Sequence, residues 1–399
     1  MNKSNDEQDE RQIAEDFRRQ LQECALKGRS RPANAELMRW LDENPELLEY
    51  VAHVSWGAAP GTGLTPEQFK EELAAVPLVT PHDDPFTHAV VHMFSQQIEC
   101  ACRDLGIPLY SGVAYGSTPE LAVSANKYGV HFTQASIVTL SIGFVTFCSS
   151  ISRLIALSLP HERHGEQLRV SFAPKLVMAK IRADFDLRKY WEEVLRDYAL
   201  GPGPLSGNHS LVPFPASRTR AHVLFAMERF SLAHEYGHHI WQHGKEQEAA
   251  VDGNSNPFKD EFEADLFAVG IERYIGLQET PPNPFSASGA AGALLLKFHE
   301  CVHRVRQVLS TGDDAIKSDG VHPETRDRIK AFGVLDHEIP EPQRDNLKKL
   351  RADCVTIVDE MYNLLKPNFL EMHRQGVRPL SSESLNGFDG SVRIFGQEL

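Results

Sequence analysis

Two short segments in the second half of the chain place histidines and carboxylates at helical spacing. The first reads His-Glu-Tyr-Gly-His at 234–238, and the second reads Glu-Phe-Glu-Ala-Asp at 261–265. Residues four apart lie on one face of a helix, about one turn apart, so His234 and His238 can hold one metal ion between them. A third ligand from the second segment has to reach the same ion. The two segments therefore predict two helices that meet closely, which restricts the folds open to the chain.

The expected metal is one Zn²⁺ ion. Two imidazoles and a carboxylate leave the fourth position of a tetrahedral zinc open, as in catalytic sites. Glu235 projects roughly 100° around the helix from His234, so it can reach a water on the ion without binding the ion itself. It is the predicted general base. Glu261 is the favoured third ligand, and Glu263 is the alternative, although Glu263 points away from the helical face that Glu261 shares with Asp265.

A surface helix that happens to carry two histidines is the alternative to a metal site. The chain has 18 histidines, so the first segment alone is a modest signal. Gly237 argues against the alternative, because a residue without a Cβ lets another segment approach the helix closely. The carboxylates of the second segment also follow within a plausible loop distance. Together these features favour the metal site.

Composition and charge narrow the class of protein. Lys plus Arg number 41 and Asp plus Glu number 55, a net charge of −14 that disfavours a general binder of nucleic acids or anionic membranes. The 6 cysteines include no C-x-x-C pair, so we expect reduced thiols. The N-terminus lacks the features of a signal peptide, and Arg153 interrupts the apolar stretch 135–160. We therefore expect a cytoplasmic protein with neither nucleic-acid nor membrane partners.

Hydrophobic periodicity and turn residues predict a mainly helical α+β chain. The β-branched run 136–140 is the clearest strand. The other expected strands are 110–115, 121–125 and 130–133, and the expected helices are 5–28, 33–54, 66–75, 85–104, 143–159, 185–198, 217–241, 257–274, 287–309, 323–333 and 342–365. Ser217 or Thr219 is expected to cap the first metal helix. We divide the chain into an N-terminal helical region (1–80), a metal-binding domain (81–335), a C-terminal helical extension (336–375) and a turn-rich tail (376–399).

A third segment, at 322–329, reads His-Pro-Glu-Thr-Arg-Asp-Arg-Ile. H-E-x-G-H with a downstream E-x-E-A-D resembles the glutamate-zincin peptidases, and the third segment resembles their H-P-x-x-x-x-R-I element. The order of strand, helix and metal segments is most similar to the Lit-type phage-exclusion peptidases, over roughly residues 120–335. The resemblance implies a zincin-like core with a small sheet, an active-site helix and a second ligand helix. The zinc ligands that it implies are His234, His238 and Glu261, with Glu235 as base and Asp265 behind the ligands.

Position on the helix supports the same role for Asp265. A zinc-binding histidine needs an acceptor for its second ring nitrogen, and a carboxylate one turn after Glu261 is well placed to supply it. A second donor to the oxyanion usually helps peptide hydrolysis, and the candidates are His322, Arg328 and Tyr274. His322 has an alternative role as a zinc ligand in a latent state, and Arg328 as a structural ion-pair partner. The residues expected to face the core or to lie behind the ligands are Tyr236, His239 and His243.

The activity that the resemblance implies is zinc-dependent hydrolysis of peptide bonds in an intracellular protein, as part of phage defence by abortive infection. The expected partners are a protein or peptide substrate and an activating protein. Two alternatives stay open at this point. One is a regulatory metallopeptidase that cleaves a transcriptional repressor. The other is a zinc-stabilised interaction module without turnover, for which a general base at Glu235 would have no use.

Overall fold

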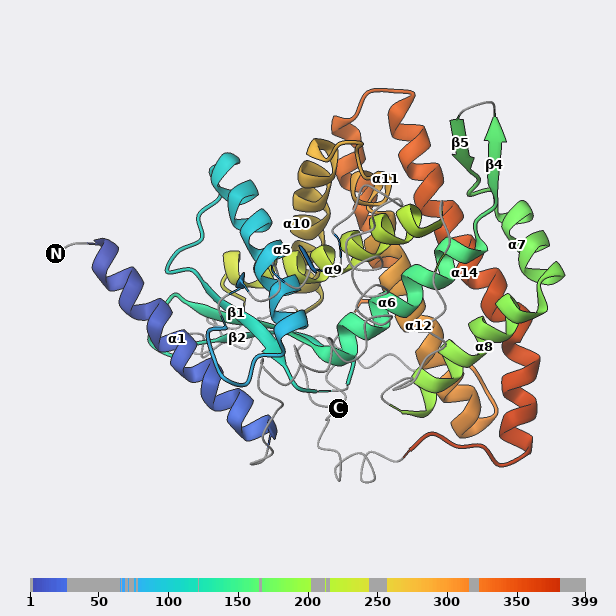
Figure 1. The fold of residues 1–399 in the computed structure, drawn as a ribbon, viewed down its shortest axis with the longest axis horizontal. Helices are drawn as coiled ribbons and strands as arrows, with labels where there is room; N and C mark the ends of the chain where they lie inside the picture. Colours follow the sequence, from blue (N-terminus) through green and yellow to red (C-terminus); the bar gives the residue numbers. More distant parts are fainter. Residues whose placement is uncertain are drawn as a thin grey trace.

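The computed structural model describes residues 3–26, 65, 67–68, 71, 75–76, 78–120, 122–164, 167–201, 212, 216–243, 257–315 and 323–380. Over these residues the chain is mostly helical, with one three-stranded sheet and one short hairpin (Figure 1). This confirms the expected mainly helical α+β class. The predicted helix 33–54 and most of the predicted helix 66–75 lie outside the described residues, as does the tail from 381.

The small sheet has the strand order β1-β3-β2. Its strands are β1 (Val113–Thr118), β2 (Ala125–Gly129) and β3 (Ser136–Ser141). The central strand β3 pairs in parallel with β1, where Ala114 lies opposite Ile137, and antiparallel with β2. Ala114 and Ile137 pack with Ala14, whereas Val138 and Leu140 join the main core. The sheet is therefore covered on both faces, which accounts for the complete burial of β1 and β3.

The strand at 136–140 is confirmed, but the other three expected strands are displaced or absent. Tyr110 and Gly112 have positive φ angles of 48° and 85°, so the chain turns there and β1 starts only at Val113. The second strand begins at Ala125 instead of ending there. The expected strand 130–133 is wrong, because these residues form the turn between β2 and β3, with Phe132 at a φ of 61°. Short apolar runs carry no information on which residues a tight turn will take.

Helix α1 (Lys3–Leu26) lies along the sheet, as Figure 1 shows. Its buried Arg18 donates to Asp83 with an Nη1–Oδ1 distance of 2.6 Å, and Gln22 donates to the same carboxylate at 2.8 Å. A Cβ on Gly116 of β1 would overlap the Arg18 guanidinium. The helix expected at 5–28 thus docks on the sheet through a buried ion pair together with Ala14 and Leu21, whereas Ile13 and Phe17 are exposed.

Helix α9 (Ala216–Ile240), which carries the first metal segment, lies among the other helices of the main body. They are α5 (Pro85–Asp104), α6 (Ile142–Ser158), α7 (Pro174–Ala183), α8 (Phe185–Leu200), α10 (Pro257–Gln278), α11 (Pro284–Ser288), α12 (Ala290–Thr311) and α13 (Thr325–Ala331). Because α6, α10, α12 and the sheet all pack against α9, the helix is buried on nearly every side rather than along one stripe. Ser217 and Thr219 lie inside its first turn, so neither is the expected cap.

The C-terminal part of the described chain is longer and more regular than expected. A 3₁₀ segment, η2 (Phe332–Glu338), leads to α14 (Gln343–Arg374), which continues past the expected end at 365. Asp336 accepts from Arg273 of α10 at 2.8 Å and from Arg351 of α14 at 2.5 Å. The sequence patterns also missed α7 and the hairpin of β4 (His161–His164) and β5 (Gln167–Val170). The division into four segments stays a prediction.

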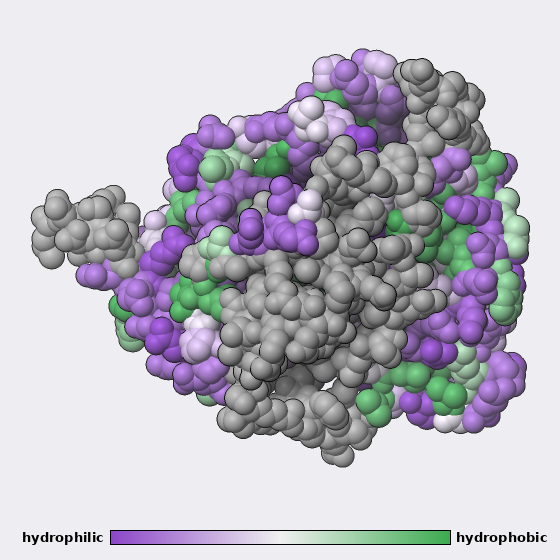
Figure 2. Space-filling view, viewed as in Figure 1, coloured by the Kyte–Doolittle hydropathy of each residue, from purple (hydrophilic) through white to green (hydrophobic). Residues whose placement is uncertain are grey.

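None of the described helices carries an apolar stretch long enough to cross a bilayer. This includes α6, which contains most of the apolar run noted in the sequence. Figure 2 shows one face of the molecule, where hydrophilic residues are interspersed with small groups of apolar ones. The helix expected at 143–159 is confirmed as α6, and 12 of its residues are buried.

A buried carboxyl on α9 makes the stability of this body depend on pH. Glu228 is 2% exposed, and burial raises the pKa of its carboxyl to about 8 against the charge of Arg220. Cys148 of α6 lies near it. The fold prefers the protonated carboxyl, so this group's contribution to stability is full below the ordinary pKa of 4.5 and is lost as the pH rises through about 8.

We expect Glu228→Gln to raise the free energy of unfolding at about pH 8.5 by on the order of 3 kcal/mol, and to change it little at about pH 5. Urea titrations of both proteins at the two pH values measure this. The exposed Glu338→Gln is the matched control and should follow the wild type. Equal stability of the wild type and Glu228→Gln at the higher pH would contradict the prediction.

Candidate metal centre

Helices α9 and α10 meet at a glycine. A Cβ on Gly237 would lie 2.8 Å from the Cα of Ala264 and 3.1 Å from its carbonyl oxygen. Only a residue without a side chain lets the two backbones come this close. The contact brings the carboxylates of α10 within reach of the histidines of α9, as the sequence predicted for Gly237.

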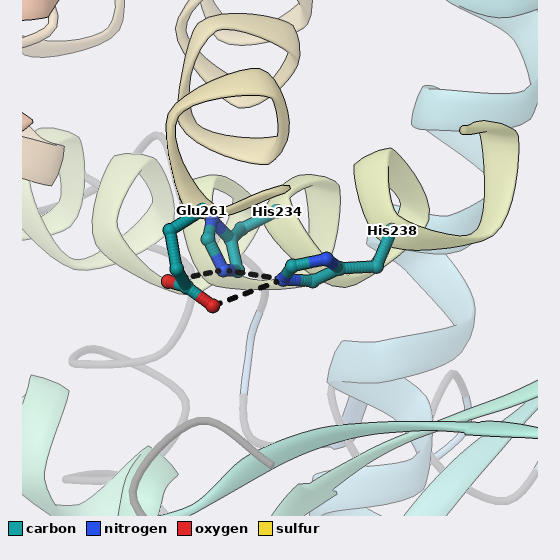
Figure 3. A group of neighbouring side chains, drawn as sticks. All are labelled: His234, His238 and Glu261. Carbon is teal, nitrogen blue, oxygen red and sulfur yellow. Dashed lines mark hydrogen bonds and ion pairs between the residues drawn. The ribbon is translucent and has the colours of Figure 1, made fainter. Parts of the chain in front are cut away.

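Three side chains converge beside this contact (Figure 3). The Nε2 atoms of His234 and His238 lie 3.1 Å apart. The Glu261 carboxylate reaches both rings, with Oε2 3.6 Å from Nε2 of His234 and Oε1 3.5 Å from Nε2 of His238. Ligand atoms about 2.1 Å from a tetrahedral ion are separated by about 3.4 Å. The three atoms are therefore spaced closely enough to bind a single metal ion.

A buried ion pair supports the ligands from behind. Oδ1 of Asp265 lies 3.0 Å from Nδ1 of His234. Arg328 donates to both oxygens of Asp265, at 2.7 and 2.8 Å, and its Nη2 lies 3.2 Å from Oε2 of Glu261. Burial alone would raise the pKa of Asp265, but the charge and hydrogen bonds of Arg328 lower it below its ordinary value. The acceptor that His234 needs is thus a carboxylate, as for many metal-binding histidines, and here Arg328 holds it ionised.

The carboxyl group of Glu235 is enclosed next to the ligands. It is 3% exposed, and among the described residues its Oε1 has no hydrogen-bond partner. Burial raises the pKa of Glu235 to about 7, although the charge of His234 acts in the opposite direction. A carboxyl of this kind, close to a metal site and free of internal hydrogen bonds at one oxygen, can exchange a proton with a bound molecule.

Other predicted site residues do not join the three ligands. Glu263 lies 3.2 Å from Nε2 of His243 and 3.4 Å from Lys259, so the alternative third ligand faces away from the pair. Tyr274 lies nine residues beyond Asp265 on α10, and its hydroxyl donates to Asp104 of α5 at 3.3 Å. Tyr274 therefore contacts α5 in this structure, and nine residues of helix place it about 13 Å along α10 from Asp265. Its role as a second donor stays a prediction.

The two remaining candidates for the second donor, Arg328 and His322, have different outcomes. Arg328 has the structural role considered for it, as the ion-pair partner of Asp265 and Glu261. His322, the other candidate donor or latent ligand, lies outside the described residues. Its role stays a prediction.

Of the three residues expected to face away, two bind neighbours in the core. Tyr236 donates to Glu99, and His239 bonds to Ser136 and to the carbonyl of Leu109. His243 is different, because its Nδ1 lies 2.8 Å from Nδ1 of the ligand His238. This contact agrees with one of the two positions expected for His243, behind the ligands, although His243 follows the end of α9 and has no helical relation to His238.

Lys127 is a further residue that the sequence did not single out. Its Nζ donates to the carbonyl oxygen of His243 at 2.7 Å, which ties the turn after α9 to β2. The charge of Lys127 also lowers the pKa of Glu235, against the larger effect of burial. Strand β2 therefore borders the ligand cluster.

The centre combines three convergent ligand atoms, a carboxylate-arginine pair behind them and a buried carboxyl beside them. Such a donor set can hold a divalent cation and leave part of its coordination sphere free for a bound molecule. No family model, no curated protein and no solved structure matches the chain.

Proposed function

We propose that the chain is a zinc-dependent endopeptidase that hydrolyses peptide bonds of an intracellular protein. The observation that carries the proposal is the convergence of His234, His238 and Glu261 on one point, with Glu235 buried beside them. Two imidazoles and one carboxylate form the donor set of hydrolytic zinc sites. The sheet, the helix α9 and the helix α10 would then be the core elements of a zincin-like fold.

In this proposal each residue has a defined task. A zinc ion held by the three ligands would polarise the scissile carbonyl and make a water more acidic. Glu235 accepts a proton from the attacking water and passes it to the leaving amine. Asp265 holds His234 in the tautomer that presents Nε2 to the ion, and Arg328 keeps Asp265 ionised.

The biological role that we propose follows the resemblance to the Lit-type peptidases: cytoplasmic cleavage of a host protein in phage defence, in response to an activating protein. A zinc-stabilised interaction module would be the non-enzymatic alternative. A buried carboxyl beside the ion costs free energy that a structural zinc site has no reason to bear. Glu235 therefore favours the enzyme.

The test compares cells that express the wild type, Glu235→Gln or His234→Ala. Glu235→Gln should bind zinc as the wild type does, yet lower the rate of cleavage at least about 10²-fold, because general base catalysis is lost. His234→Ala should lose both zinc and cleavage. Metal analysis of the purified proteins and a proteome-wide search for new N-termini measure the two effects and identify the cleaved protein.

The glutamine variant is nearly isosteric with Glu235, so it also serves as the control for folding. New N-termini that occur equally in cells with Glu235→Gln would rule out this residue as the base. A biological effect that persists in that variant, without any cleavage, would favour the interaction module.

A further inference from the structure

A second group of potential ligands lies next to the first. The side chains of His243, Asp260 and Glu263 also offer ligand atoms within 4.8 Å of one another. Nε2 of His243 lies 3.2 Å from Oε2 of Glu263 and 3.7 Å from Oδ1 of Asp260. Two adjacent groups of this kind are compatible with either a site for two ions or a site for one ion with a supporting group.

The contact between His238 and His243 decides between the two arrangements. Their Nδ1 atoms lie 2.8 Å apart, at hydrogen-bond distance. A neutral imidazole carries one proton on its two nitrogens. When Nε2 of His238 binds an ion, the proton of that ring has to be on Nδ1. His238 then donates and Nδ1 of His243 accepts.

The same reasoning extends one step further from the ion. Because Nδ1 of His243 accepts, the proton of its ring is on Nε2, where it is donated to Glu263 at 3.2 Å. A nitrogen that carries a proton has no lone pair for a metal ion. An ion on His238 therefore excludes an ion on His243 as long as the hydrogen bond between the two rings is made.

The surroundings hold His243 in the required position. Lys127 of β2 binds its carbonyl oxygen at 2.7 Å, and Gln242 before it adopts a φ of 52°, which turns the chain after α9. Glu263 is itself paired with Lys259 at 3.4 Å. The middle residue and the far end of the hydrogen-bonded series thus each have a further partner.

We propose that His243 is a positioning residue that fixes the tautomer and the ring orientation of His238, with Glu263 as the final acceptor, and that these two neighbouring groups together bind one ion rather than two. The inference rests on the metal-binding part of the proposed function and not on peptide hydrolysis. His238 is thus held by His243 and, through it, by the Glu263 carboxylate, whereas His234 is held directly by the Asp265 carboxylate.

Two substitutions of His243 separate the hydrogen bond from other contributions of the side chain. In His243→Gln the amide oxygen can accept from His238 and the amide NH₂ can donate to Glu263. His243→Leu can do neither. The exposed His337→Leu serves as the control for the loss of a histidine.

The measurements are the number of Zn²⁺ ions per chain, the zinc affinity by competition with a chelator, and the visible spectrum of the Co²⁺ form. We expect one ion per chain in the wild type. We expect a zinc affinity about 10–100-fold lower in His243→Leu, as for other residues that orient metal ligands, with a changed Co²⁺ spectrum. His243→Gln should restore most of the affinity, and His337→Leu should match the wild type.

Three results would overturn the proposal. One is a wild type that binds two ions, one of which is lost in His243→Leu, since His243 would then be a ligand. The second is a His243→Leu variant that folds and binds zinc as tightly as the wild type. The third is an equal loss of affinity in both His243 variants. The outcome is independent of Glu235→Gln, so the proposed hydrolysis can fail while the support of His238 stands.

Discussion

Replacing Asp265 with alanine should destabilise the metal-free fold by about 3–5 kcal/mol, because the change leaves a buried arginine without its main partner. Asp265 is fully buried, and both of its oxygens accept from Arg328. The guanidinium keeps the contact to Glu261 at 3.2 Å. It will then compete with the metal ion for that carboxylate, so we also expect weaker zinc binding, by about 10–100-fold.

Urea titration of the metal-free proteins measures the loss of stability, and chelator competition measures the loss of affinity. The double variant Asp265→Ala/Arg328→Leu separates the unpaired charge from the cavity. It should recover much of the stability, because the unpaired buried guanidinium has been removed, but not the zinc affinity, because His234 still lacks its acceptor. A single variant that is destabilised by less than about 1 kcal/mol would show that Arg328 does not need this partner.

The Gly237→Ala variant should lose metal binding through a change in backbone packing alone. The added methyl group would lie 2.8 Å from the Cα of Ala264, a separation that real Cβ atoms do not adopt. Helix α10 has to move away from α9, and Glu261 and Asp265 move with it. Overpacking of this kind costs about 1–3 kcal/mol of stability. We also expect at least a roughly tenfold loss of zinc affinity, because the Glu261 carboxylate moves away from the two histidines.

Gly270→Ala is the matched control on α10. Among the described residues, a Cβ at Gly270 meets only Leu335, at 3.9 Å. This variant should therefore keep the affinity and gain up to about 1 kcal/mol of stability from its higher helix propensity. The two variants are compared by urea titration and zinc competition. If Gly237→Ala binds zinc as the wild type does, the close approach of the two helices is not what brings Glu261 to the histidines.

The sequence determined the parts of this site that depend on residues close together in the chain. Helical spacing placed His234 with His238 and Glu261 with Asp265, and it turned Glu263 away from them, as the structure has it. The same local periodicity predicted α5, α6 and α10 nearly to their ends. These predictions succeed because the geometry of a helix is fixed by its backbone hydrogen bonds, whatever surrounds it.

The tertiary structure decided how these pieces are placed against one another. In the folded chain Tyr274 bonds to Asp104 of α5, Arg328 pairs with Asp265, and His243 lies at hydrogen-bond distance from His238. It also set the ends of the short strands, which depend on pairing with β3 and on tight turns. Local sequence patterns cannot predict these contacts, because the residues involved are far apart in the chain or lie beyond the end of a helix. They come together only when the helices and the sheet pack around α9.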